Sequence, residues 1–457
     1  MEKKILIVVA ALLSSALLGA VLWGVGQPMP IVSTAAITLF VAVLWVTEAL
    51  PIPATSLIPF GLLPLAGVIS HKEAASSFGS HVILLLMSAF MLSKGLERAN
   101  LHKRFAMYML KLTGSGSALK LVLGFMLTTA LLSMWVSNTA TVLMMLPMAI
   151  AIINAVDNPR FAIALILGIA YAASLGGVGT PIGTPPNIIF MSVYEETQGV
   201  EYNFIEWMKT GVPIVLVATP LMAMWLTRGI KVVGDISLPA PGAWTVAEKR
   251  ALMIFGTVAL AWIFRPYWTG FLGLTTVGDS TIAMVGVVAM FLVTNGETKD
   301  GKAQRLLDWP TANDIPWGML LLFAGGICIA KGFTASGLSA LMGEWMTGLS
   351  TLPILALIFS ICLFVTFLTE ITSNTATATL LMPVLATAGV AVGVDPRILM
   401  VPAAISASCA FMLPVATAPN AIAYSTEKFD IKTMAREGFT LNLIVATVVT
   451  LACYLTL

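Results

Sequence analysis

Long apolar runs separated by short polar segments extend along the whole chain. A helix of about 20 predominantly apolar residues is long enough to cross the hydrocarbon core of a membrane, so the runs predict an all-α polytopic membrane protein with about eleven transmembrane helices. The predicted crossings are 5–24, 31–47, 54–70, 82–96, 160–194, 208–228, 251–272, 280–295, 316–335, 397–426 and 437–457.

The first run follows two lysines at the N-terminus, which is also the pattern of a secretory signal peptide. The stretch from Ile5 to Trp23 is long enough to span a bilayer, and much of the remaining chain is equally apolar. We therefore interpret it as a first transmembrane helix.

Two further apolar regions, 117–156 and 351–394, contain the same polar sequence. Ser-Asn-Thr-Ala-Thr occupies residues 137–141 and returns at residues 373–377. We interpret each region as a helical hairpin with this motif at its tip. Re-entrant hairpins are preferred over pairs of full crossings, because the tips carry no loop-like charge apart from Glu370. That carboxylate is itself interpreted as paired inside the protein, with a role at a cation site as the weaker alternative.

A second sequence pattern, P-x-[GA]-T-x-P-N-x-I, occurs at residues 181–189 and again at 414–422. Both copies lie in the apolar runs, 160–194 and 397–426, that are too long for one straight crossing. Proline removes a backbone donor and clashes with the preceding turn. Each run is therefore predicted to be a broken helix with an unwound middle.

These polar breaks predict a transport site. A break at membrane depth is tolerated only where protein buries it or where it lines a watery cavity, because unpaired backbone groups are costly in lipid. Corresponding breaks in two halves of a chain point to the binding site of a secondary transporter. A third repeated element, at residues 94–96 and 331–333, lies at opposite predicted faces of the membrane. The halves are therefore predicted to be inverted repeats, which permits alternating access.

The composition agrees with a membrane protein. Hydrophobic residues make up 58% of the 457 residues and charged residues 10%, whereas an ordinary soluble domain is about 45–50% apolar. The net charge of +2 does not indicate a nucleic-acid partner. Cys328, Cys362, Cys409 and Cys453 all lie in apolar runs and are interpreted as buried free thiols.

Most basic residues fall in loops on one predicted side of the membrane. The positive-inside rule therefore predicts a cytoplasmic N-terminus and an outside C-terminus in a bacterial cytoplasmic membrane. The basic residues left outside are Lys72, Lys209, Arg265, Lys331 and Arg397.

The predicted organisation divides each half into a scaffold part and a transport part that holds the hairpin and the broken helix. A cytoplasmic linker joins the halves. The predicted boundaries are 1–115 and 116–228 for the scaffold and transport parts of the first repeat, 229–250 for the linker, and 251–350 and 351–457 for the second repeat.

The chemistry of the two motif pairs favours the binding of a cation and an anion together. Hydroxyl, amide and freed backbone oxygens form a neutral oxygen set that suits a small hard cation such as Na⁺. The N-terminus of the helix after each break offers N–H groups to an anion. Neither motif pair contains Arg, Lys or His. An anion would therefore be neutralised by helix ends and bound cations, which would couple the two binding events.

Three other interpretations remain open. Hydroxyl and amide side chains in membrane helices often bond only to neighbouring backbone, although matched duplication argues against that here. An intramembrane hydrolase using Ser137 or Ser373 would need a base, and His71, His81 and His102 all lie in the first quarter of the chain. A channel is expected to use rings of like groups rather than a repeat within one chain.

With both motif pairs identified, the sequence resembles the divalent-anion:sodium symporter family, close to its bacterial INDY-type dicarboxylate transporters. The resemblance covers nearly the whole chain. It depends on Ser-Asn-Thr at 137–139 and 373–375, Gly-Thr-Pro-Pro-Asn at 183–187, Ala-Thr-x-Pro-Asn at 416–420 and Trp-Val-Thr-Glu-Ala-Leu-Pro at 45–51.

The resemblance implies Na⁺-coupled symport of C4 dicarboxylates such as succinate, malate and fumarate by a homodimer with an elevator motion. Na⁺-independent exchange, or symport of citrate or sulfate, are the alternatives within the same fold, and no organic cofactor is implied. Ala418 departs from the family pattern, because relatives often have proline there as at Pro185.

By motif position the resemblance also implies ligand residues. The first Na⁺ would bind Ser133, Ser137, Asn138 and Gly183, and the second Thr369, Thr372, Asn374 and Ala416. The substrate carboxylates would bind Asn138, Thr139, Thr184, Asn374, Thr375 and Thr417.

Overall fold

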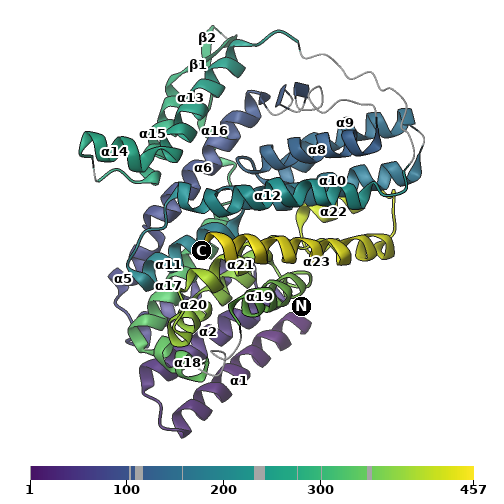
Figure 1. Ribbon diagram of the computed structural model, residues 1–457. Coiled ribbons are helices and arrows are strands. Elements are labelled where there is room, and N and C mark those ends of the chain that lie inside the picture. The colour runs from purple at the N-terminus through teal and green to yellow at the C-terminus, as the bar shows by residue number, and fades with distance from the viewer. Residues whose placement is uncertain are drawn as a thin grey trace.

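The fold is almost entirely helical, and within the described residues the strands form one short hairpin (Figure 1). This confirms the predicted all-α class. The computed structural model describes residues 2–101, 104, 105, 107, 108, 117–156, 158–230, 242–274, 276–299, 301–346 and 353–457. Residues 231–241, which are half of the predicted linker at 229–250, lie outside the described residues.

The chain begins with six helices. They are α1 (Glu2–Gly24), α2 (Met29–Thr47), α3 (Ile52–Thr55), α4 (Ile58–Leu65), α5 (His71–Phe78) and α6 (His81–Arg98). Three of them, α1, α2 and α6, lie in stretches long and apolar enough to cross a membrane. The single crossing predicted at 54–70 is instead broken between α3 and α4. Ser56 lies at the break, where its hydroxyl bonds to the Ile52 carbonyl and to Trp45. A Cβ on Gly325 would lie 2.7 Å from the Ser56 carbonyl oxygen, so another helix packs directly on the break.

Each half then contains a helical hairpin, a broken helix and a long final helix, in the same order. The first set is α8 (Ala118–Ser133), α9 (Asn138–Val156), α10 (Pro159–Gly176), the 3-10 turn η1 (Gly177–Gly179), α11 (Pro185–Gln198) and α12 (Phe204–Leu226). The second set is α19 (Ile354–Thr369), α20 (Asn374–Val392), α21 (Arg397–Ala407), α22 (Ala418–Tyr424) and α23 (Ile431–Thr456). Both hairpin tips and both breaks lie where the sequence motifs predict them.

The segment between these sets holds the remaining elements. They are α13 (Val246–Ile263), α14 (Arg265–Leu272), α15 (Asp279–Leu292), β1 (Thr294–Lys299), β2 (Lys302–Arg305), α16 (Trp309–Asn313), α17 (Trp317–Ser336) and α18 (Leu338–Met346). Helices α13 and α14 are bent by 78° at their junction. Strands β1 and β2 pair antiparallel between α15 and α16.

Local sequence explains where several helices begin and end. Asn203 caps α12 and Thr245 caps α13, each in a capping box with the glutamate three residues later. Asp430 accepts from the Thr433 amide at the start of α23. At the C-terminal ends of α17 and α20, Gly337 and Gly393 adopt positive φ, which glycine tolerates without strain.

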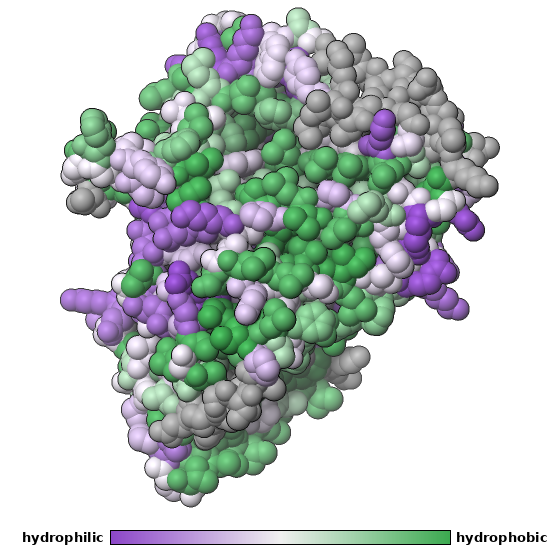
Figure 2. Space-filling model, viewed as in Figure 1, coloured by the Kyte–Doolittle hydropathy of each residue, from purple (hydrophilic) through white to green (hydrophobic). Residues whose placement is uncertain are grey.

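The long helices define a multi-span membrane protein. Eight helices of the described chain are long and apolar enough to cross a membrane, or nine if the bent pair is one span, and several apolar helices are shorter. The predicted number of eleven therefore stays a prediction. Figure 2 shows a broad green apolar area over the middle of this face, with purple hydrophilic residues gathered toward its left and right edges.

Candidate functional site

The two hairpin tips and the two helix breaks meet around one cavity of about 990 Å³. Asn138 and Asn374, one from each half, both line it. The predicted ligand residues in its wall are Ser137, Asn138, Thr139, Gly183, Thr184, Thr372, Asn374, Thr375, Ala416 and Thr417. The other two, Ser133 and Thr369, are fully buried directly behind the motif asparagines.

An oxygen-rich cluster lies behind the first tip. The Ser133 hydroxyl lies 2.6 Å from both the Asn138 side-chain oxygen and the Ala173 carbonyl oxygen. Turned by 180°, the Asn138 amide would donate to that hydroxyl and, over 3.2 Å each, to the carbonyls of Ala173 and Gly183. Unturned, its oxygen faces only other acceptors. Four converging neutral oxygens are the ligand set expected for a small hard cation.

The second tip repeats this geometry with a different hydroxyl residue. Thr369 Oγ1 lies 2.6 Å from the Asn374 side-chain oxygen and 3.0 Å from the Ala407 carbonyl oxygen. Thr372 donates to the Leu368 carbonyl at 2.8 Å and lies 2.7 Å from the Thr377 hydroxyl, so it is engaged within the tip. The hydroxyl, the asparagine side-chain oxygen and the helix-end carbonyl of the first cluster are thus repeated at the second tip.

Each break is closed by an asparagine clasp from the helix that follows it. Asn187 Nδ2 donates to the carbonyls of Gly177 and Thr180 at 2.9 and 2.7 Å. Asn420 Nδ2 donates to the carbonyls of Ala410 and Leu413, both at 3.0 Å. Both amides are fully buried. The partners precede the two asparagines by the same numbers of residues, so the breaks share one backbone path.

Glu370 anchors the second break from the neighbouring tip. Its Oε1 accepts from the amides of Phe411 and Met412 at 2.7 and 2.9 Å and from Asn442 Nδ2 at 2.8 Å. Its Oε2 accepts from the Leu413 amide at 3.0 Å. The interpretation as a paired interior carboxylate is confirmed.

The first break is held by a different set of groups. Met134 takes the tip position of Glu370, and its carbonyl accepts from the Thr180 hydroxyl. Trp207 in α12 donates its indole N–H to the Val178 carbonyl at 2.7 Å. Gly211, one turn later, allows α12 to approach, since a Cβ there would lie 2.4 Å from that carbonyl oxygen.

One contact joins the breaks of the two halves directly. The Thr184 hydroxyl of the first break lies 3.2 Å from the Ser408 hydroxyl of the second, and both residues are buried. The two unwound segments are therefore in direct contact with each other.

Helix ends provide the electrostatics of the cavity wall. Helices α9, α11 and α20 each begin with residues that line the cavity, as does the short α22. Their first N–H groups lack intrahelical partners and give a partial positive charge at the cavity. Helices α8, α10, α19 and α21 end near the same place. Their terminal carbonyls give a partial negative charge around the oxygen clusters.

Full charges in the cavity wall come from other elements. Lys94 in α6 lies 2.7 Å from Asp314 and 3.6 Å from Glu97, and Glu48 follows α2. All four residues line the cavity and belong to the predicted scaffold parts. Apart from Ser93 of α6, the hydroxyl and amide residues of the wall come from the predicted transport parts.

Several residues of the site were not assigned a role by sequence reasoning. Asn187 and Asn420 were visible as a repeated position of the second motif, and duplication could have identified them. Ser408, Asn442 and Trp207 carried no such signal, because their partners lie far away in the sequence.

A duplicated tip-and-break arrangement around one cavity, inside a bundle of apolar helices, defines a membrane transport protein. Comparisons with known proteins agree. A family model described as a citrate transporter matches residues 42–398. Two curated relatives, the sodium-dependent dicarboxylate transporters SdcS of Staphylococcus saprophyticus and Staphylococcus aureus strain USA300, are 42% and 40% identical, over 92% of this chain and 85% and 84% of their own.

A solved structure also shares the fold. The YdaH transporter of Alcanivorax borkumensis superposes with a TM-score of 0.57 at 15% identity, over 82% of this chain and 86% of that one. That similarity concerns the fold alone. The chain belongs to the citrate transporter family, and the predicted membership of the divalent-anion:sodium symporters is confirmed. It is a multi-span membrane transporter rather than an enzyme.

Proposed function

We propose that this transporter carries C4 dicarboxylates such as succinate, malate and fumarate across the bacterial cytoplasmic membrane together with Na⁺. The observation that carries the proposal is the single cavity lined by both Ser-Asn-Thr motifs and both helix breaks. The names of the curated relatives support the same ion and substrate class. Na⁺ is cargo in this scheme, and we expect no organic cofactor.

The substrate carboxylates would meet the hydroxyl, amide and backbone N–H groups at the four helix starts. Such groups bind anions without a basic side chain, because the helix ends carry partial positive charge. A dianion bound in this cavity would contact one motif of each half. The proposed substrate residues are Asn138, Thr139, Thr184, Asn374, Thr375 and Thr417.

The two oxygen clusters fit the cations of this proposal. One Na⁺ would bind Ser133, Ser137, Asn138 and Gly183, and the other Thr369, Thr372, Asn374 and Ala416. The Asn138 amide offers a physical route to coupling. A cation would hold its oxygen toward Ser133, which directs its nitrogen away from the cluster to donate to a carboxylate. Each ion would then raise the affinity for the substrate, and the substrate for the ion.

The division of the cavity wall supports an elevator movement in a homodimer. The charged residues come from the predicted scaffold parts, and all hydroxyl and amide residues except Ser93 come from the predicted transport parts. The transport parts would move across the membrane with the bound ions and substrate, while the scaffold parts form the dimer contact. We further propose a cytoplasmic N-terminus and an outside C-terminus.

Uptake into proteoliposomes tests this function. Radiolabelled succinate should accumulate when an inward Na⁺ gradient is imposed, and not when choline replaces Na⁺. Asn138→Ala and Asn374→Ala should each lower uptake to the level of empty vesicles without loss of folded protein in detergent. Leu143→Ala is a matched control, since Leu143 lines the same cavity but offers no polar group. Succinate uptake that proceeds unchanged in choline would contradict Na⁺ coupling.

The second candidate function is transport of a different anion by the same site. The matching family model is described as a citrate transporter, and Ala418 leaves the second break without the proline found at Pro185. A competition panel of succinate, malate, fumarate, citrate and sulfate at several Na⁺ concentrations separates these possibilities. Exchange of dicarboxylates across Na⁺-free vesicles would favour the exchanger alternative.

A further inference from the structure

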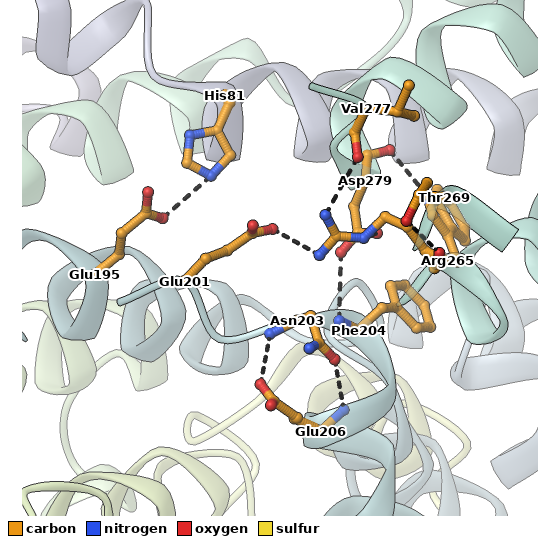
Figure 3. A network of polar contacts seen from close by, with 11 residues as sticks. His81, Glu195, Glu201, Asn203, Phe204, Glu206, Arg265, Thr269, Val277 and Asp279 are labelled. Atoms are coloured by element: carbon orange, nitrogen blue, oxygen red, sulfur yellow. Dashed lines mark hydrogen bonds and ion pairs between the residues drawn. The ribbon is translucent and has the colours of Figure 1, made fainter. Parts of the chain in front are cut away.

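A cluster of charged residues outside the cavity joins three separate segments of the chain (Figure 3). His81 begins α6, Glu195 lies near the end of α11 and Glu201 lies between α11 and α12. Arg265 begins α14 and Asp279 begins α15. We name these five residues the junction cluster. Its side chains range from half-exposed His81 to nearly buried Asp279.

Three polar contacts in the junction cluster cross the predicted boundary between scaffold and transport parts. His81 Nε2 lies 3.1 Å from Glu195 Oε2. Arg265 Nη2 donates to Glu201 Oε1 at 2.8 Å. The Phe204 amide donates to Asp279 Oδ2 at 3.3 Å. In each pair one residue belongs to 1–115 or 251–350 and the other to 116–228.

Groups within the scaffold side hold Arg265 and Asp279 in position. Arg265 Nε lies 2.8 Å from Asp279 Oδ1, and the Trp262 indole N–H donates to the Asp279 carbonyl at 2.9 Å. The ring of Trp262 also stacks on Phe204 of α12, with centroids 4.9 Å apart. The cluster therefore combines ion pairs with a buried aromatic contact, both across the same boundary.

The junction cluster lies just beyond one end of the cavity. Leu86 of α6 lines the cavity, and His81 is five residues earlier, about 7 Å along the helix axis. A separate recess of about 10 Å³ lies between α6 and α11, around His81 and Glu201. Lys94 and Glu97, toward the other end of α6, line the open cavity of about 990 Å³. Along α6 the large cavity thus borders residues 86–97, whereas the recess beside the first turn is far smaller.

We propose that the junction cluster is a latch that holds the cavity-open state and must separate each time the transport parts move. The inference rests on the proposed transport movement. Its contacts exist only while α11 and the start of α12 lie against α6, α14 and α15. The two boundary-crossing pairs, His81–Glu195 and Arg265–Glu201, are partly exposed to solvent, whereas the stacked rings of Trp262 and Phe204 are buried. Together these contacts favour this state over one in which they part, because a population shifts toward the state with the better contacts.

Bridging two cysteines tests the latch. His81→Cys with Glu195→Cys would be made in a variant whose four buried cysteines are replaced and whose uptake has been verified. A short bifunctional thiol reagent should lower the initial rate of Na⁺-driven succinate uptake by about tenfold or more, and cleavage of the bridge should restore it. The bridged protein should still show Na⁺-dependent stabilisation by succinate in a thermal shift assay. A long flexible reagent at the same pair should leave uptake nearly unchanged.

A second cysteine pair provides the matched control. Ser76 and Lys331 are bonded at 2.7 Å between α5 and α17, which both belong to predicted scaffold parts. Bridging Ser76→Cys to Lys331→Cys should leave uptake within about twofold of the unbridged protein, because this contact is not expected to separate. Full uptake with the 81–195 bridge in place would overturn the latch, and so would equal arrest by the control bridge. A parent protein without Na⁺-dependent uptake would instead overturn the proposed function.

Discussion

The two helix breaks follow the same backbone path but are held in different ways. In the first, every residue from Gly177 to Thr184 is buried, and the chain packs against itself. A Cβ on Gly183 would lie 2.5 Å from the Gly177 carbonyl oxygen. In the second, Val415 is 80% exposed, and the carboxylate of Glu370 gathers the backbone amides.

This difference shows which features the site requires. Both halves keep the hydroxyl, the motif asparagine and the carbonyl of the oxygen cluster, and both keep the asparagine clasp. The support behind them is glycine packing in one half and a buried charge in the other. The positions of the oxygen-cluster atoms are therefore common to both halves, whereas the groups that support them differ.

Removing the carboxylate of the second break should have the largest effect. Glu370→Ala would leave three backbone amides and Asn442 without their acceptor. Each buried donor that loses its partner costs about 1–3 kcal/mol, so the variant should be several kcal/mol less stable and should not transport. Thermal unfolding in detergent and succinate uptake measure these effects.

The corresponding change in the first half is the control for Glu370. Met134 occupies the same position of the first tip, and only its backbone carbonyl bonds to the break. Met134→Leu should therefore retain most stability and uptake. If both variants behaved alike, the two breaks would not differ in their support.

Adding one methyl group at Gly183 should impair Na⁺ binding at the first oxygen cluster and leave the second cluster unchanged. Gly183→Ala would drive a Cβ into the backbone of Gly177, and no side-chain rotation can relieve that contact. Because the Gly183 carbonyl belongs to the first oxygen cluster, the Na⁺ concentration for half-maximal uptake should rise by about tenfold or more. The second half already has alanine at the matching position.

The reverse substitution sharpens that result. Ala416→Gly removes a methyl group from a wall that also contains exposed Val415. Half-maximal Na⁺ should stay within about twofold of the original value, since no contact of the second oxygen cluster depends on that methyl group. A large change in half-maximal Na⁺ for Ala416→Gly, with a small change for Gly183→Ala, would mean that the second break, and not the first, depends on close packing.

Sequence reasoning located the site because its signal is duplicated. The motif at 137–141 and 373–377 predicted both hairpin tips, and the prolines predicted both breaks. A break in the crossing predicted at 54–70 was missed, because it depends on the close approach of Gly325 from α17. Contacts such as Glu370 with Phe411 join residues far apart along the chain, and hydropathy does not report which distant segments pack together.

The asparagine clasps allow a direct comparison of the two supports. Asn187→Ala and Asn420→Ala each remove two buried hydrogen bonds from the backbone of a break. Glu370 still holds residues 411–413 in the second case, so uptake should fall further for Asn187→Ala. We expect the uptake rates of the two variants to differ by about fivefold, which corresponds to the free energy of roughly one hydrogen bond. Equal losses of uptake in the two variants would indicate that Glu370 does not help to hold the backbone of the second break.

A modest effect is expected at the contact between the halves. Ser408→Ala removes the hydroxyl that lies 3.2 Å from Thr184, and a neutral hydrogen bond is worth about 0.5–1.5 kcal/mol. The half-saturating succinate concentration should therefore rise by about two- to tenfold with little change in maximal rate, because Thr184 loses its support but keeps its own hydroxyl.

Ser174 is the matched control, since it follows Ala173 as Ser408 follows Ala407. Its hydroxyl is buried without a hydrogen-bond partner among the described residues, so Ser174→Ala should leave uptake unchanged. A rise in half-saturation for Ser174→Ala equal to that for Ser408→Ala would mean that packing, and not the link between the breaks, accounts for the effect.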